Sequence, residues 1–161
     1  MDINFRAAVT LTHHLLPVLR RHQGAHLANV SSVFGIIAPP GQSAYVSSKF
    51  AVRGFTEAIR NESYGTGVGV TVIHPGGIKT RIADTARSGS GVPANEAQKA
   101  RDAFNRLLTI APETAARVIL NGIERRRARV LIGTSAKLPD IVARIAPAHA
   151  ISILNRIRTS R

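Results

Sequence analysis

Residues 27–49 read LANVSSVFGIIAPPGQSAYVSSK and predict a strand, a loop and the start of a helix. The apolar run that ends in two serines predicts the strand, and the proline- and glycine-containing segment 38–42 predicts the loop. A helix is expected to begin at Ser43, whose hydroxyl could accept hydrogen bonds from the free N–H groups of the first turn. The stretch therefore brings a serine at a strand end beside the beginning of a helix.

Three side chains of this stretch have the chemistry of a proton-transfer site. Tyr45 and Lys49 lie four positions apart, so they share one helical face about one turn apart. The positive charge of the lysine favours the phenolate form of the tyrosine, which suits an acid/base catalyst. The hydroxyl of Ser32 can hydrogen-bond a carbonyl or an alkoxide. The Tyr/Lys spacing alone is more typical of a surface pair on an ordinary helix, because this spacing is common.

The surrounding motifs, taken in order, resemble the short-chain dehydrogenase/reductase family. The strand that ends at Ser32 resembles the family's strand with the active-site serine, and residues 45–49 (YVSSK) match its Tyr-x-x-Ser-Lys signature. Ser32 precedes the tyrosine by 13 positions, the family's usual interval, which favours this serine over the one before it. Residues 75–80 (PGGIKT) match the family's Pro-Gly-x-x-x-Thr element, and Asn4 falls where the family has a helical asparagine.

This resemblance implies a function and a set of roles. Enzymes of the family use NAD or NADP to transfer a hydride between the nicotinamide and a carbonyl or secondary alcohol of a small molecule. By resemblance, Tyr45 is the general acid and base, and Lys49 also holds the nicotinamide ribose. Ser32 would polarise the carbonyl, and Asn4 would support a proton relay through water. The residues implied to bind the cofactor are Tyr45, Lys49, Pro75, Gly76, Ile78 and Thr80.

The predicted fold class is α/β, a three-layer Rossmann-like parallel sheet, truncated to about three strands with flanking helices. Residues 68–73 are almost continuously apolar, which suits a parallel strand covered on both faces. The glycines after this strand would let backbone approach a ligand closely, where open α/β sheets bind ligands. The predicted strands are 25–31, 68–73 and 128–133. The predicted helices are 2–21, 43–64, 94–108, one from residue 112, and two short helices split at Pro147.

One partial domain is expected to occupy residues 1–161. Residues 81–95 are rich in glycine and serine, which suits a mobile lid over a site. The expected divisions are a catalytic segment, a substrate lid, and a last helix and strand with the C-terminal helices, at 1–80, 81–111 and 112–161.

The first half of the family's pattern does not occur in the sequence. Neither its Gly-rich turn T-G-x-x-x-G-x-G nor its Asn-Asn-Ala-Gly turn is present, and Gly65-Thr66-Gly67 follows a helix rather than a strand. The chain is therefore expected to be the catalytic half of a larger domain, cut within its fourth helix. Strand 25–31 would then keep an open edge, and the pyrophosphate would lack its helix N-terminus. The alternatives are a non-enzymatic remnant that pairs with other chains and a basic protein that binds nucleic acid or an anionic surface.

The chain has 161 residues, a formal net charge of +13 and no cysteine. Without cysteine neither a disulfide nor a thiolate metal site can form, and adjacent His13 and His14 point to different sides of a helix, so no metal site is expected. The charge surplus could attract nucleic acid or an anionic surface, but seven aromatic residues do not suffice for a stacking surface, so no specific nucleic-acid site is expected. Because no secretory signal or apolar run of membrane-spanning length occurs, a cytoplasmic location is expected.

The helix Ser43–Tyr64 is expected to form a homo-oligomer interface, because the corresponding helix of the family often joins dimers. Gly54 inside this helix costs about 0.5–1 kcal/mol relative to alanine. Close packing against another helix is therefore expected at that position. The two C-terminal helices could cover the site, pack on a partner subunit or lie on a membrane surface, and packing is the favoured interpretation.

Overall fold

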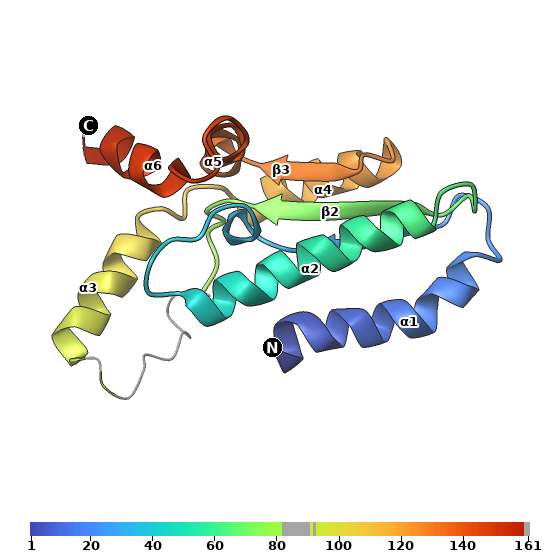
Figure 1. Ribbon diagram of the computed structural model, residues 1–161, viewed down its shortest axis with the longest axis horizontal. Coiled ribbons are helices and arrows are strands. Elements are labelled where there is room, and N and C mark those ends of the chain that lie inside the picture. Colours follow the sequence, from blue (N-terminus) through green and yellow to red (C-terminus); the bar gives the residue numbers. More distant parts are fainter. Residues whose placement is uncertain (82–90, 92, 160–161) are drawn as a thin grey trace.

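The computed structural model describes residues 1–81, 91 and 93–159, and it confirms the predicted α/β class (Figure 1). Its elements are η1 (Asp2–Arg6), α1 (Ala7–Leu19), β1 (His26–Val30), η2 (Val33–Gly35), α2 (Ser43–Glu62), β2 (Gly69–Pro75), α3 (Ala94–Asn105), α4 (Pro112–Glu124), β3 (Arg129–Ile132), α5 (Thr134–Ile145) and α6 (Ala150–Thr159). Of these, η1 is a π-helix and η2 a 3₁₀-helix. Most of the predicted lid at 81–95 lies outside the described residues.

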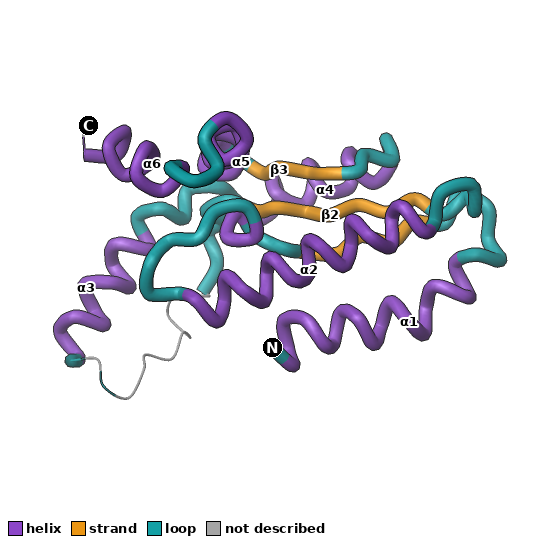
Figure 2. The backbone as a smooth tube through the Cα atoms, in the orientation of Figure 1, coloured by secondary structure: helices purple, strands orange, loops and turns teal. Residues whose placement is uncertain are grey.

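The three strands form one parallel sheet in the order β1-β2-β3 (Figure 2). Parallel neighbours need a crossover connection, and α2 provides it between β1 and β2, while α3 and α4 provide it between β2 and β3. Every residue of β2 except Pro75 is buried, which confirms a central strand covered on both faces. Because the strands are parallel, their carboxyl ends meet at one edge of the sheet.

Helices cover both faces of the sheet and make a three-layer structure. On one face, Leu27 and Val70 form an apolar cluster with Leu16 of α1 and residues of α2. Strand residues alternate between faces, so Ile73 points to the opposite face, where it forms a second cluster with Ala115 of α4. Figure 1 shows α1 and α2 on the same side of the sheet. The layers are therefore α1 with α2, the sheet, and α4.

A buried chain of hydrogen bonds fixes the position of α2 along β1. The Asn29 amide donates to the Thr56 hydroxyl at 3.1 Å, and this hydroxyl donates to the Val52 carbonyl at 2.6 Å. Leaving a buried polar group without a partner costs about 1–3 kcal/mol. Sliding the helix along the strand would break these bonds, so the first turns of α2 are held at the carboxyl end of β1.

Two helix beginnings differ from the prediction. Gln42 is the N-cap of α2 and no side chain caps this helix, so the predicted capping role of Ser43 is wrong. The first predicted helix opens with the π-turn η1, and neighbouring residues Asn4 and Phe5 both contact α2 there. Asn4 hydrogen-bonds a serine of α2, and the Phe5 ring lies edge-on to Phe55 at 6.1 Å between centroids. The widened turn lets two consecutive side chains face the same helix.

The outer edge of β1 agrees with the predicted open edge. Within residues 1–81, 91 and 93–159, β1 pairs with β2 alone, and Val30 on β1 is 51% exposed. None of the described helices combines the length and the apolar character needed to cross a lipid bilayer.

Two helical glycines have different surroundings. A Cβ atom on Gly122 of α4 would collide with the Val130 side chain of β3, so this glycine lets the helix and the sheet approach closely. Around Gly54 of α2, no described heavy atom beyond the local helix backbone lies within 4 Å of the Cβ position. The close packing expected at Gly54 is therefore not made by the described part of the chain.

The substitution Gly54→Ala is expected to raise the free energy of unfolding by about 0.5–1 kcal/mol, since alanine loses less backbone entropy in a helix. The matched change Gly122→Ala is expected to lower it by about 1–3 kcal/mol, because the added methyl group displaces Val130. Urea unfolding followed by circular dichroism measures both effects. Equal changes in the two variants would contradict the difference in packing.

Candidate active site

The two serines after β1 have different hydrogen-bond partners. Buried Ser31 donates its hydroxyl to the Lys49 carbonyl at 2.8 Å, which joins the end of the strand to α2. Half-buried Ser32 is the N-cap of η2, and its hydroxyl oxygen accepts from the Phe34 N–H at 3.1 Å. That contact leaves the Ser32 hydroxyl proton free for another acceptor. The different contacts agree with the choice of Ser32 as the candidate catalytic serine.

Tyr45 and Lys49 lie on the first two turns of α2, beside the end of β1. The Lys49 ammonium nitrogen is 5.6 Å from the Tyr45 ring centroid and donates to the Val30 carbonyl at 3.2 Å. Partial burial lowers the pKa of Lys49 from its ordinary value. The Phe34 ring lies edge-on to the Tyr45 ring, with centroids 6.1 Å apart, and so covers it from the loop that begins at Ser32.

Asn4 reaches the site through Ser48. The Asn4 side-chain amide donates to the Ser48 hydroxyl at 3.2 Å, and that hydroxyl donates to the Tyr45 carbonyl at 2.7 Å. Ser48 is 1% exposed, so this route is a buried link between η1 and the start of α2. Ser48 was not predicted as a site residue, although its place in the YVSSK motif is a signal in the sequence.

His74 is a second residue that sequence reasoning missed. It is fully buried at the carboxyl end of β2, and its Nδ1 lies 2.8 Å from the Ser32 carbonyl oxygen. A carbonyl only accepts, so Nδ1 carries the proton and donates it. The pKa of His74 is lowered to about 4, mainly by burial and in smaller part by the charges of Arg129 and Arg53. A polar residue in an otherwise apolar strand, directly before Pro-Gly, is the signal that could have found it.

The glycines of the PGGIKT segment approach other parts of the chain. A Cβ atom on Gly77 would collide with the Leu107 carbonyl, and one on Gly76 would collide with Ser135. The Gly77 carbonyl also accepts from the N–H of Ile110 at 3.0 Å. These glycines therefore have a packing role in the described structure, and their approach to a ligand stays a prediction.

The structure brings most of the predicted site residues to one edge of the sheet. Ser32 follows β1, Lys49 donates to this strand end with Tyr45 one helical turn before it, and Pro75 ends β2. Pairing of β1 with β2 places these two strand ends side by side. Thr80 lies farther along the chain and is exposed beside a shallow cavity of about 340 Å³.

The residues at this edge fit the nicotinamide half of a dinucleotide. The Lys49 ammonium has three donor hydrogens, and its one described hydrogen bond goes to Val30, so ribose hydroxyls could accept from the others. Half-buried Ile78 is close to the same strand end. Among the described residues, no glycine-rich turn leads from a strand into a helix to hold a pyrophosphate, since Gly65-Thr66-Gly67 lies at the opposite end of β2.

A sequence model of the short-chain dehydrogenase family matches residues 1–91, more than half of the chain. The chain belongs to this family. The match extends from η1 through the two serines and the YVSSK motif to the PGGIKT segment. It confirms the family resemblance that these motifs indicate.

Similar proteins come from bacteria and vertebrates. The Mycobacterium tuberculosis protein SadH is 45% identical over 148 residues, which cover 90% of this chain and 52% of SadH. Dehydrogenase/reductase SDR family member 7B of Xenopus laevis is 33% identical over 156 residues, which cover 96% of this chain and 47% of that protein. The chain thus spans about half the length of these family members.

Solved structures of the family share the fold. A short-chain dehydrogenase/reductase from Burkholderia phymatum in complex with NAD aligns with a TM-score of 0.69 at 25% identity, over 80% of this chain and 50% of that one. A short-chain dehydrogenase from Burkholderia cenocepacia in complex with NADP aligns with a TM-score of 0.72 at 21% identity, over 93% of this chain and 56% of that one. The three-stranded sheet is thus part of a Rossmann-like fold.

The buried neutral state of His74 predicts a loss of stability in acid. The pKa of this group falls from 6.5 in the unfolded chain to about 4 in the folded one, so at intermediate pH only the unfolded chain binds the proton. Its contribution is complete above about pH 6.5 and is lost as the pH falls toward about 4, and it amounts to roughly 3 kcal/mol.

The variant His74→Gln keeps a donor for the Ser32 carbonyl but does not titrate, so its free energy of unfolding should fall by less between about pH 7 and pH 4.5. The exposed residue His13 offers the matched control His13→Gln, which should keep the pH dependence of the original chain. Urea unfolding at a series of pH values measures the difference. Identical pH profiles for the two variants would overturn this role of His74.

Proposed function

We propose that this chain forms the catalytic part of an NAD(P)-dependent oxidoreductase that interconverts a carbonyl and a secondary alcohol. The observation that supports this most is the placement of the Lys49 ammonium beside the Tyr45 ring, at the strand end that precedes Ser32. A phenol, an ammonium and a hydroxyl with a free proton are the groups needed to move one proton to or from a carbon–oxygen bond. Membership of the short-chain dehydrogenase family supports the same chemistry.

In this proposal, Tyr45 donates its phenolic proton to the substrate oxygen during reduction and takes it back during oxidation. The Lys49 charge stabilises the phenolate that is left, and the partly buried position strengthens this interaction relative to bulk water. Ser32 donates its hydroxyl proton to the substrate oxygen and orients it. The bound nicotinamide supplies or accepts the hydride. Asn4, linked to α2 through its serine contact, supports the route by which a proton returns from water.

The cofactor is proposed to be NAD or NADP, with its nicotinamide end against β1 and β2. Lys49 would donate to the ribose hydroxyls, and Tyr45 would lie beside the same ring. Pro75, Gly76, Ile78 and Thr80 would meet the carboxamide end, with support from their place after β2. Residues 81–111 are proposed as the substrate lid.

The substitution Tyr45→Phe is expected to abolish turnover without unfolding the protein, because it removes only the acidic hydroxyl. Reduction of a panel of aldehydes and ketones is followed by the loss of reduced-nicotinamide absorbance, and thermal melting checks the fold. The exposed residue Tyr64 offers the matched control Tyr64→Phe, which should keep full activity. Full activity of Tyr45→Phe would refute the proposed role.

Cofactor binding by this 161-residue chain tests the nicotinamide contacts directly. Reduced nicotinamide mononucleotide and NADH are titrated by fluorescence. Binding of both is expected to saturate, because the proposed contacts are made to the nicotinamide half, which both ligands contain. Lys49→Met is expected to weaken both roughly 10- to 100-fold, through loss of a charged hydrogen bond worth roughly 1.5–3 kcal/mol. Lys137→Met, on an exposed lysine of α5, is the control and should change neither. Absence of saturable binding would contradict the cofactor proposal.

A second candidate function is pairing with another chain without catalysis. The outer edge of β1, which no described strand pairs with, favours it, since such an edge presents N–H and C=O groups to a further strand. The helix α2 is proposed as a further contact between two copies, and the open space around Gly54 leaves room for it. Analytical ultracentrifugation measures the association. A monomer at all concentrations that nevertheless binds cofactor would remove this candidate.

A further inference from the structure

A cavity of about 750 Å³ lies between the loop after η2, α2, β3 and the helices α5 and α6. No residue of the candidate active site lines it, so it is a separate site. Part of its wall is apolar, with Ile36 from the loop, Phe50 from α2 and Ile151 from α6. Small-molecule sites typically measure roughly 300–1,000 Å³. The cavity is therefore large enough for an organic ligand with an apolar body.

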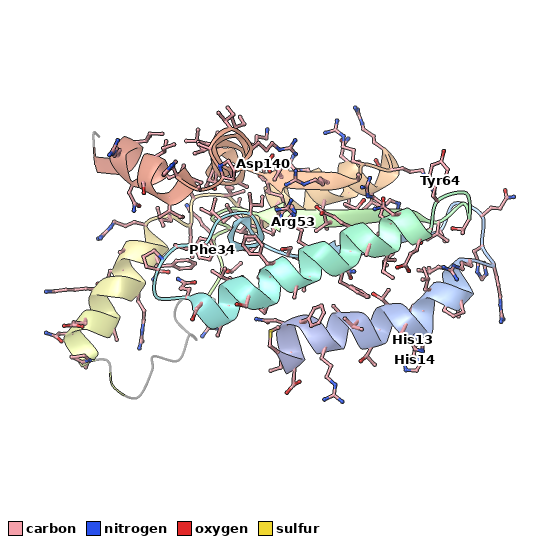
Figure 3. All side chains as sticks on the ribbon, in the orientation of Figure 1. His13, His14, Phe34, Arg53, Tyr64 and Asp140 are labelled. Atoms are coloured by element: carbon pink, nitrogen blue, oxygen red, sulfur yellow. The ribbon has the colours of Figure 1, made fainter. Side chains whose placement is uncertain are left out.

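The charged part of the wall has more guanidinium groups than carboxylates. Asp140, which is 6% exposed, accepts from Arg129 at 2.7 Å on one oxygen and from Arg144 at 3.0 Å on the other. One carboxylate thus binds two guanidinium groups and neutralises one of them. Figure 3 shows Asp140 of α5 near Arg53 of α2, the third arginine of the wall.

Arg53 leaves the excess of positive charge at the cavity unchanged, because it has its own carboxylate partner. Its Nε lies 3.0 Å from a carboxylate oxygen of Glu57, and its Nη1 donates to the Gly35 carbonyl at 3.2 Å. The pair with Glu57 is neutral, so the cavity keeps one positive charge that no described carboxylate of its wall matches. The Nε of Arg129 is buried without a described partner, and the Arg129 side chain is only 21% exposed.

The surplus charge acts on the interior of the protein. Burial is the main reason that the pKa of His74 is low; the charges of Arg129 and Arg53 lower it further, and Glu57 acts in the opposite direction. Since charges inside a protein are screened less than in water, an anion placed between these arginines would be stabilised. A single unmatched charge suits a monoanion better than a dianion.

We propose that this cavity binds an amphipathic carboxylate, with its head group at Arg129 and Arg53 and its apolar chain against Ile36, Phe50 and Ile151. Guanidinium groups bind carboxylates through paired hydrogen bonds, which gives the head group its orientation. The apolar wall would remove the methylene groups of the chain from water, which stabilises the complex. This inference does not depend on the proposed redox function.

Isothermal titration of the 161-residue chain with decanoate tests the proposal. One saturable site is expected, and decanol, which has the same chain without the charge, is expected to bind at least tenfold more weakly. Acetate, which has the charge without the chain, is expected not to bind at the same concentrations. Equal affinity for decanoate and decanol, or uptake without saturation, would overturn the proposal.

Two variants locate the site. Arg129→Gln is expected to weaken decanoate binding at least tenfold, whereas Arg125→Gln, which removes an exposed arginine outside the cavity, should leave it unchanged. Ala143→Leu fills part of the cavity without changing charge and should also weaken binding; it decides the question if Arg129→Gln does not fold. Equal losses for Arg129→Gln and Arg125→Gln would show general charge attraction instead. Unchanged affinity in Ala143→Leu would place the ligand elsewhere.

Discussion

The candidate site depends on the hydrogen bonds that hold the end of β1 against the second turn of α2. Ser31 donates to the Lys49 carbonyl, and the Lys49 ammonium donates to the Val30 carbonyl, so strand and helix exchange two polar contacts at one point. Gly35 makes this approach possible, since a Cβ atom there would collide with both Ser31 and the Lys49 carbonyl. The lysine is thereby fixed beside the tyrosine that precedes it by one turn.

The end of β2 adds a second constraint on the same region. His74 donates to the carbonyl of Ser32, so a neutral side chain in the core holds the backbone of the candidate catalytic serine. Burial disfavours the charged form of the ring and lowers the pKa of His74, so the side chain that makes this contact is neutral. The serine is thus positioned by β2 through its carbonyl, while its hydroxyl stays available to a substrate.

The excess of basic residues is found both on the exposed surface and at the wall of a cavity. Much of the net charge of +13 lies on exposed arginines and lysines, but Arg129 and Arg144 share the single carboxylate of Asp140 at the wall of a cavity. Family membership accounts for the sheet edge with Tyr45 and Lys49. The cavity between α2 and α5 is a different feature, and its occupant is inferred from charge and shape alone.

The sequence by itself determined the order of strands and helices, the family, and the grouping of Tyr45 with Lys49, because these depend on local periodicity and on motifs with fixed spacing. Only the tertiary structure decided the role of His74, the link from Asn4 through a buried serine, and the balance of charges around Asp140. The first two join residues that are distant in the chain, and the third depends on how β3 packs against α5. No local pattern records which polar groups share one interior. The packing role of the glycines after β2 was also invisible in the sequence, since it depends on where the backbone near Leu107 returns to the sheet.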